Sequence, residues 1–183
     1  MRTALVIVDM LNDFVDGVLA NPAAPPLVPP IARLADEARS ADDGLVVYAN
    51  DAHHPDDVEL RVFPPHAMAG TTGAEVVPGL APLSGDLVVP KRFYSAFTET
   101  DLDAELRARG IRRLVLVGQH TDCCVRHTAY DAFRLGYDIR VSPVATTVYA
   151  PTGGEPVEVR QAQALAYLVT YYRARLEEVE EAW

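Results

Sequence analysis

Five short runs of apolar residues, several of them rich in valine, most constrain what this chain can fold into. They cover Ala4–Val8, Leu45–Asn50, Leu87–Val89, Leu114–Val117 and Ile139–Val141. Near-continuous hydrophobicity over so few residues is typical of strands buried on both faces, as in a parallel sheet covered by helices. The intervening stretches carry helical patterns, which right-handed crossovers would place on both sides of the sheet. The pattern predicts an α/β fold of three layers, built on a doubly wound and mainly parallel sheet.

Helical periodicity follows most of these runs. Helices are expected over Pro30–Arg39, over Leu102–Arg109, from Cys124 to about Gly136, and from about Glu155 to near the C-terminus. In the last of these, apolar residues recur in alternating steps of three and four, at Ala162, Leu165, Val169, Tyr172, Leu176 and Val179. This pattern is typical of a helix packed on the sheet, and it is also compatible with a seam between subunits.

Two stretches are expected to be loops. Residues Asn21–Pro30 contain five prolines and cannot be helical throughout. Residues Asp51–Pro82 have scattered Pro, Gly and His and no clear period. A connection of this length within a compact domain is often functional, so the second loop is a candidate part of a site.

Length, charge and cysteine content exclude several classes of protein. The 183 residues suit one domain, 1–183, and no linker or shift in composition divides them. A net charge of -10 disfavours binding to nucleic acid or to an anionic membrane surface. The only cysteines, Cys123 and Cys124, are adjacent, so no disulfide framework is expected. Neither a signal peptide nor a membrane span is recognisable, and a cytoplasmic location is expected.

Reactive side chains come at or just after the ends of four predicted strands. Asp9, Asp51 and Lys91 each close or follow an apolar run, and Cys124 opens the helix after the fourth. Ligands of open α/β sheets bind outside the carboxyl ends of the strands, so these groups are expected to share one edge. A single Asp after a strand is more often a loop cap, but four such groups together indicate a reactive site.

Cys124 is the candidate nucleophile of that site. The first turn of a helix presents unpaired N–H groups and partial positive charge, which favour a thiolate. We expect Cys124 to attack a carbonyl carbon, Asp9 to act as the base that takes its proton, and Lys91 to stabilise the charges. Backbone N–H groups near His120 and Cys124 would hold the oxyanion. Cys123 is interpreted as an inert neighbour.

The long loop contributes a second cluster of polar side chains. Asp51 and His53 are two residues apart, and Glu59 and His66 follow. A mixture of nitrogen and oxygen ligands suits Zn²⁺, Mn²⁺ or Fe²⁺ better than Mg²⁺ or Ca²⁺. By spacing alone these residues could equally be solvated loop groups, so a metal site is one of two interpretations here.

Three segments resemble the isochorismatase-like superfamily of cysteine hydrolases, and most closely its nicotinamidases. Residues 6–14 resemble the family's opening strand with a catalytic aspartate, here Asp9. Residues 90–97 resemble its catalytic lysine segment, here Lys91, and residues 118–128 its nucleophile segment, here Cys124. The order and spacing of the three groups make the match specific, and it covers most of the chain.

The resemblance implies further features of fold and site. It implies six strands, a cis peptide bond between Gln119 and His120 that directs the His120 N–H to the oxyanion, and a tendency to form homo-oligomers. It implies a divalent metal, zinc before manganese or iron, and no organic cofactor. Residues Asp51, His53, Glu59 and His66 match metal ligands, and Phe14 and Phe63, with Tyr94, match substrate-contacting positions.

The activity expected from the resemblance is hydrolysis of nicotinamide to nicotinate and ammonia through a Cys124 thioester, a reaction of NAD salvage. Related members hydrolyse other small amides, carbamoyl compounds or isochorismate, and the triad alone does not separate these. Isochorismate is less favoured because its hydrolysis does not need the cysteine and because a dianion gains from more arginines. A catalytically silent binding protein on the same fold is the non-enzyme alternative.

Overall fold

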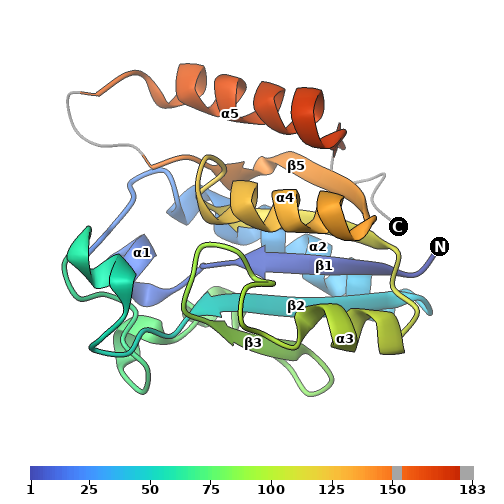
Figure 1. Ribbon diagram of the computed structural model, residues 1–183, viewed down its shortest axis with the longest axis horizontal. Helices are drawn as coiled ribbons and strands as arrows, with labels where there is room; N and C mark the ends of the chain where they lie inside the picture. The colour runs from blue at the N-terminus through green and yellow to red at the C-terminus, as the bar shows by residue number, and fades with distance from the viewer. Residues whose placement is uncertain (150–153, 178–183) are drawn as a thin grey trace.

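A six-stranded, wholly parallel sheet forms the centre of the computed structural model, which describes residues 1–149 and 154–177 (Figure 1). The strands run in the spatial order β3-β2-β1-β4-β5-β6. Their bounds are β1 Thr3–Val8, β2 Gly44–Asp51, β3 Leu87–Lys91, β4 Arg113–Gln119, β5 Asp138–Thr147 and β6 Arg175–Leu176. This order is that of a doubly wound sheet, so the predicted fold class is confirmed.

Helices cover both faces of the sheet. Their bounds are α1 Asn12–Val15, α2 Val28–Ser40, α3 Leu102–Ala108, α4 Cys124–Leu135 and α5 Val157–Tyr172. Among the described residues, 3₁₀ turns lie at Pro25–Leu27, Val58–Arg61, Thr72–Ala74 and Pro78–Leu80. In Figure 1, α3 and α4 lie in front of the sheet and α2 lies behind it, while α5 runs above α4.

Alternation along the buried strands divides the core into two apolar layers. In β1, Leu5 and Ile7 pack on the α2 side, and Val6 and Val8 pack on the side of α3, α4 and α5. Every residue of β1 is buried, which explains its continuous run of apolar side chains. The long apolar strands therefore form because both faces of the sheet are covered.

The carboxyl ends of the central strands lie level with one another at one edge of the sheet. Val8 of β1 is aligned with Ala49 of β2 on one side and with Gly118 of β4 on the other. Asp51 and Lys91 are direct partners at the ends of β2 and β3. The chain changes winding direction between β1 and β4, and the crevice at such a switch point is where ligands bind.

The C-terminal part differs from the sequence-based expectation. Helix α5 ends at Tyr172, because Arg173 adopts a left-handed backbone with φ 56°. Leu176, expected to lie in the same helical stripe, belongs instead to the short edge strand β6. Val179 lies outside the described residues. The predicted helix to near the C-terminus is therefore too long, and its repeat does not form one continuous seam.

The two loop predictions agree with the structure in large part. Between residues 52 and 82, the described chain contains only 3₁₀ turns and single bridges, including His53 paired with Met68. The first predicted loop is shorter than expected, since α2 already begins at Val28. Among the described residues, no helix is long and apolar enough to cross a membrane.

Candidate active site

A close approach of two strands sets the position of the nucleophile segment. Gly118 in β4 has φ 96°, and a Cβ atom there would lie 2.1 Å from the Val8 carbonyl oxygen. Only glycine fits this backbone and this spacing. The next peptide bond but one, between Gln119 and His120, is cis, at the position that the family resemblance implied. The chain then turns through Cys123, the N-cap residue, into α4, whose first residue is Cys124.

Lys91 joins two carboxylates beneath the cavity. Its ammonium lies 2.8 Å from Oδ2 of Asp9 and 2.5 Å from Oδ1 of Asp51, and its side chain is fully buried. Burial alone would lower the pKa of Lys91, but the charges of Asp51 and Asp9 outweigh it and raise that pKa well above its ordinary value. Lys91 is therefore a permanent cation, and it partly neutralises both acids.

Asp9 has the electrostatics of a general base. Burial, together with the charge of Asp51, raises its pKa to about 7, against the opposing effect of Lys91. The backbone N–H of Asp51 donates a hydrogen bond of 2.8 Å to Asp9 Oδ1 and fixes the orientation of the carboxylate. A base whose pKa lies near neutrality can both accept and return a proton at physiological pH.

The two cysteines differ from the expectation for a helix N-terminus. The pKa of Cys124 is raised well above its ordinary value, because its thiol hydrogen-bonds to Cys123 and because it is buried. The same hydrogen bond lowers the pKa of Cys123 to about 6, with help from His127. Burial and the neighbouring thiol therefore oppose the thiolate that the helix N-terminus favours at Cys124, and the resting thiolate stays a prediction. A raised pKa at Cys124 makes a nearby base useful for removing the thiol proton.

The Gln119 side chain supports the site from behind. Gln119 is fully buried. Its amide nitrogen donates hydrogen bonds to the backbone carbonyl oxygens of Asp9 and Phe14, at 3.3 and 3.4 Å. Its carbonyl oxygen accepts a hydrogen bond of 3.0 Å from Asn21. Sequence reasoning placed Asn21 only in a loop, because nothing local to that residue indicates a contact nearly a hundred positions away.

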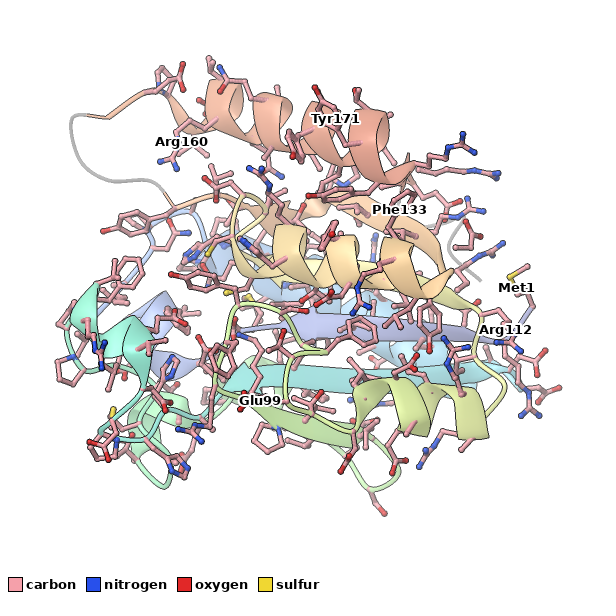
Figure 2. The ribbon with its side chains drawn as sticks, in the orientation of Figure 1. Met1, Glu99, Arg112, Phe133, Arg160 and Tyr171 are labelled. Atoms are coloured by element: carbon pink, nitrogen blue, oxygen red, sulfur yellow. The ribbon has the colours of Figure 1, made fainter. Side chains whose placement is uncertain are left out.

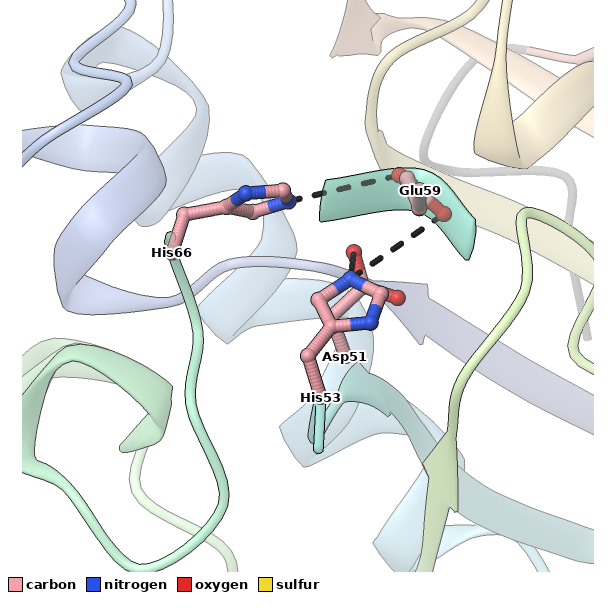
Figure 3. Close-up of side chains that lie close together, drawn as sticks. All are labelled: Asp51, His53, Glu59 and His66. Atoms are coloured by element: carbon pink, nitrogen blue, oxygen red, sulfur yellow. Dashed lines mark ion pairs between the residues drawn. The ribbon is translucent and has the colours of Figure 1, made fainter. Parts of the chain in front are cut away.

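The structure brings together the second cluster that was predicted from the sequence (Figure 3). Its members are Asp51, His53, Glu59 and His66. All four are buried, and each offers a ligand atom within 4.8 Å of the others. The His53 Nε2 atom lies 3.6 Å from Asp51 Oδ2 and 4.0 Å from Glu59 Oε2. The His66 Nε2 atom lies 4.0 Å from the other Glu59 oxygen.

Hydrogen bonds on the outer side of each ring orient the two imidazoles. The His53 Nδ1 atom lies 3.1 Å from Asp57, and the His66 Nδ1 atom lies 2.8 Å from the Pro64 carbonyl oxygen. Both Nε2 atoms are therefore left to face the cluster, as in metal sites where an outer partner fixes the tautomer. Asp57 is itself held by Arg92. The sequence analysis did not identify Asp57, although its four-residue spacing from His53 was visible.

Unpartnered atoms within this cluster fit a bound cation. Asp51 Oδ2 and His53 Nε2 are buried and have no hydrogen-bond partner among the described residues. Burial and the charge of Asp51 raise the pKa of Glu59 to about 8, because several acids are crowded together. A divalent cation would satisfy the unpartnered atoms and stabilise the ionised carboxylates, so this donor set fits the metal that the resemblance implied.

A cavity of about 320 Å³ opens over both clusters. Its walls include the three residues predicted to contact substrate: Phe14 is buried, Tyr94 is half-buried and Phe63 is 37% exposed. Four further lining residues were not found from the sequence, because no local pattern marks these positions as part of a cavity. They are Leu19, Asp122, Tyr149 and Arg160.

A comparison with protein families decides the membership of this chain. The family model of the isochorismatase domain matches residues 3–171. The chain belongs to the isochorismatase family. The match spans Asp9, Lys91 and Cys124, together with the loop that carries the second cluster. The protein is therefore a hydrolase of the isochorismatase family, and its relatives include amidases.

Solved structures of the isochorismatase family superimpose on almost the whole chain. An N-carbamoylsarcosine amidase from Thermoplasma acidophilum is 40% identical, with a TM-score of 0.88, covering 99% of this chain and 98% of its own. The nicotinamidase PncA from Bacillus subtilis is 34% identical, with a TM-score of 0.86 and coverages of 97% and 100%. A pyrazinamidase from Pyrococcus horikoshii in complex with zinc is 25% identical, with a TM-score of 0.86 and coverages of 97% and 99%.

Proposed function

We propose that this protein is an amidase that hydrolyses nicotinamide to nicotinate and ammonia through a thioester on Cys124. The observation that carries the proposal is the pairing of two buried clusters at one cavity. Asp9, Lys91 and Cys124 supply acid–base and nucleophilic groups, and a donor set suited to a divalent metal lies beside them. Similarity to a nicotinamidase supports this substrate, and similarity to a pyrazinamidase in complex with zinc supports the metal.

The reaction begins with proton transfer. Asp9, ionised at and above a pH of about 7, takes the proton of the Cys124 thiol. The thiolate attacks the carboxamide carbon, and the negative charge that develops on oxygen is held by the backbone N–H groups of His120 and Cys124. Lys91 keeps Asp9 close to the thiol and offsets the charge that accumulates there.

Collapse of the tetrahedral intermediate breaks the carbon–nitrogen bond. Asp9 returns its proton to the departing nitrogen, ammonia leaves, and Cys124 is left as a thioester. Asp9 then takes a proton from water, and the resulting hydroxide attacks the thioester carbon. The acid is released, and the same proton restores the Cys124 thiol.

The second cluster and the aromatic walls are proposed to hold the ring of the substrate. A divalent metal, most simply zinc, would be held by Asp51, His53, Glu59 and His66, and when bound it would supply a Lewis acid for the pyridine nitrogen. Phe14 and Phe63 would contact the two ring faces, and Tyr94 would close the side of the cavity.

Ammonia release from nicotinamide tests the proposed function. Purified protein is assayed as isolated, after chelation, after reloading with zinc, and as Cys124→Ala. We expect release that chelation reduces, that zinc restores and that the alanine variant abolishes. Absence of release by the zinc-loaded protein would reject nicotinamide as the substrate. A silent binding protein on the same fold would release no ammonia from any small amide.

A further inference from the structure

The residue that follows His66 has an unusual backbone conformation. Ala67 has φ 42°, in the left-handed region that residues with a Cβ atom rarely adopt. Its side chain is fully buried. Strained backbone of this kind persists where the surrounding structure holds it in place. The hydrogen bonds of Ala67 therefore show which residues maintain this conformation.

The backbone of Ala67 connects the two histidines of the candidate metal site. We call this site the metal-ligand cluster, and it consists of Asp51, His53, Glu59 and His66. The Ala67 carbonyl oxygen accepts a hydrogen bond of 2.9 Å from the backbone N–H of His53, and His66 precedes Ala67 in the chain. The conformation of Ala67 therefore helps to set how the two imidazoles lie relative to each other.

Asp13 in helix α1 holds the N–H side of Ala67. Its Oδ2 atom accepts a hydrogen bond of 2.8 Å from the Ala67 backbone N–H. The next residue, Phe14, meets the His66 imidazole edge to face, with ring centroids 5.3 Å apart. Helix α1 lies beside the loop of residues 52–82, at the left of the molecule in Figure 2. This short helix therefore contacts both the His66 ring and the backbone directly after it.

The Asp13 carboxylate has little room to move. A Cβ atom at Gly73 would lie 2.2 Å from Asp13 Oδ2, and one at Gly17 would lie 2.6 Å from Oδ1. The preceding residue, Asn12, donates a side-chain hydrogen bond of 2.8 Å to the Thr72 carbonyl oxygen and ties α1 to the same loop. Asp13 is thus enclosed at a fixed position, from which it can hold Ala67.

We propose that Asp13 is a positioning residue for the metal site. Its hydrogen bond to Ala67 maintains the left-handed backbone that directs His66 and His53 into the metal-ligand cluster. Asp13 acts through this backbone and is not itself a ligand, because it lies outside the cluster among the described residues. The inference rests on the metal of the proposed function, and it gives a residue of α1 control over metal affinity.

Zinc affinity of the folded protein, measured by competition with a chromophoric chelator, tests this role. Asp13→Ala leaves the buried Ala67 N–H without its acceptor and should weaken zinc binding by about tenfold to a hundredfold, as for other groups that orient metal ligands. Asp13→Asn keeps a carbonyl oxygen that can accept the same hydrogen bond, so it should retain most of the affinity. If both variants lose affinity equally, Asp13 acts through its charge and the proposal fails.

Two further variants control for charge and for folding. Asp16, the exposed C-cap residue of α1, provides the matched charge control, and Asp16→Asn should leave zinc affinity unchanged. Gly73→Ala keeps the Asp13 carboxylate but displaces it, so it should also weaken zinc binding. In the Asp13→Ala background the same substitution should have no further effect. Urea denaturation identifies a purely structural role, which would lower the unfolding free energy and leave zinc affinity unchanged.

The outcomes separate this inference from the proposed function. Equal zinc affinity in the wild type, Asp13→Ala and Gly73→Ala would overturn the inference and leave the nicotinamide proposal standing. Weakened zinc binding in both variants, with no ammonia release from nicotinamide by the zinc-loaded wild type, would support the inference and reject nicotinamide. A wild type that binds no zinc would overturn the inference together with the proposed metal.

Discussion

At the scale of single residues, Asp51 connects the two halves of the candidate site. One of its oxygens contacts Lys91, and the other faces His53 without a hydrogen-bond partner. The charge of Asp51 also helps to raise the pKa of Asp9. Any change in the metal-ligand cluster is therefore transmitted to the base, and the residue-scale predictions follow from this coupling.

Substitution of the two adjacent cysteines should have very different effects. Cys124→Ala removes the nucleophile and should reduce kcat by about a thousandfold or more, because triad groups act as a unit. Cys123→Ala should retain most of the activity, since it removes hydrogen bonds to Cys124 and His127 but leaves the proposed nucleophile in place. Steady-state ammonia release measures both. The reverse order of effects would show that the nucleophile is Cys123.

The pH dependence of turnover should report the base. Asp9 accepts a proton only when ionised, and burial raises its pKa to about 7. The value of kcat/KM should therefore fall about tenfold for each pH unit below that pKa. A cation beside Asp51 offsets the charge of that residue, so saturation with zinc should move the fall in kcat/KM to lower pH. If kcat/KM falls only in the pH range of an ordinary aspartate, both without and with zinc, the assignment of Asp9 as the base is contradicted.

Metal content should depend on one of two adjacent histidines. His53 is buried in the metal-ligand cluster, whereas His54 is exposed and outside it. His53→Ala should lower zinc affinity by about tenfold or more, and His54→Ala serves as the matched control. Elemental analysis after dialysis against a zinc buffer provides the measurement. Equal zinc content in both variants would remove His53 from the ligand set.

At the scale of elements, the joint between β4 and α4 determines where the nucleophile lies. β4 approaches β1 so closely at Gly118 that a side chain there would meet the Val8 carbonyl. Helix α4 ends at Leu135, and its C-cap residue, Gly136, has a left-handed backbone with open space around it. The two glycines therefore share an unusual backbone but differ in their surroundings.

Alanine substitutions at these glycines should separate strain from steric overlap. Gly136→Ala adds only backbone strain and should cost about 1–2 kcal/mol of unfolding free energy. Gly118→Ala adds the overlap with β1 and should cost about 3 kcal/mol or more. Urea denaturation of both variants measures the difference. Equal losses would show that β1 and β4 can separate without penalty.

At the scale of the whole molecule, the features that can be predicted from the sequence are those that a single segment reveals, such as a buried strand or a reactive residue at the end of a strand. The buried strands were recognisable because both faces are covered, and Asp9, Lys91 and Cys124 because strand ends meet at one edge. The strand β6 was missed, since two residues carry no period. Arg160 in the cavity wall was missed because it reaches that wall only through tertiary packing. Homo-oligomer formation stays a prediction.

Identification of the acyl-enzyme tests the central claim most directly. The zinc-loaded protein is mixed with nicotinamide, quenched in acid during turnover, digested, and mapped by mass spectrometry. We expect a nicotinoyl group on the peptide that contains both cysteines, with fragmentation placing it on Cys124 and none on a Cys124→Ala control. An acyl group on Cys123, or product formation with no covalent species in either protein, would contradict the account.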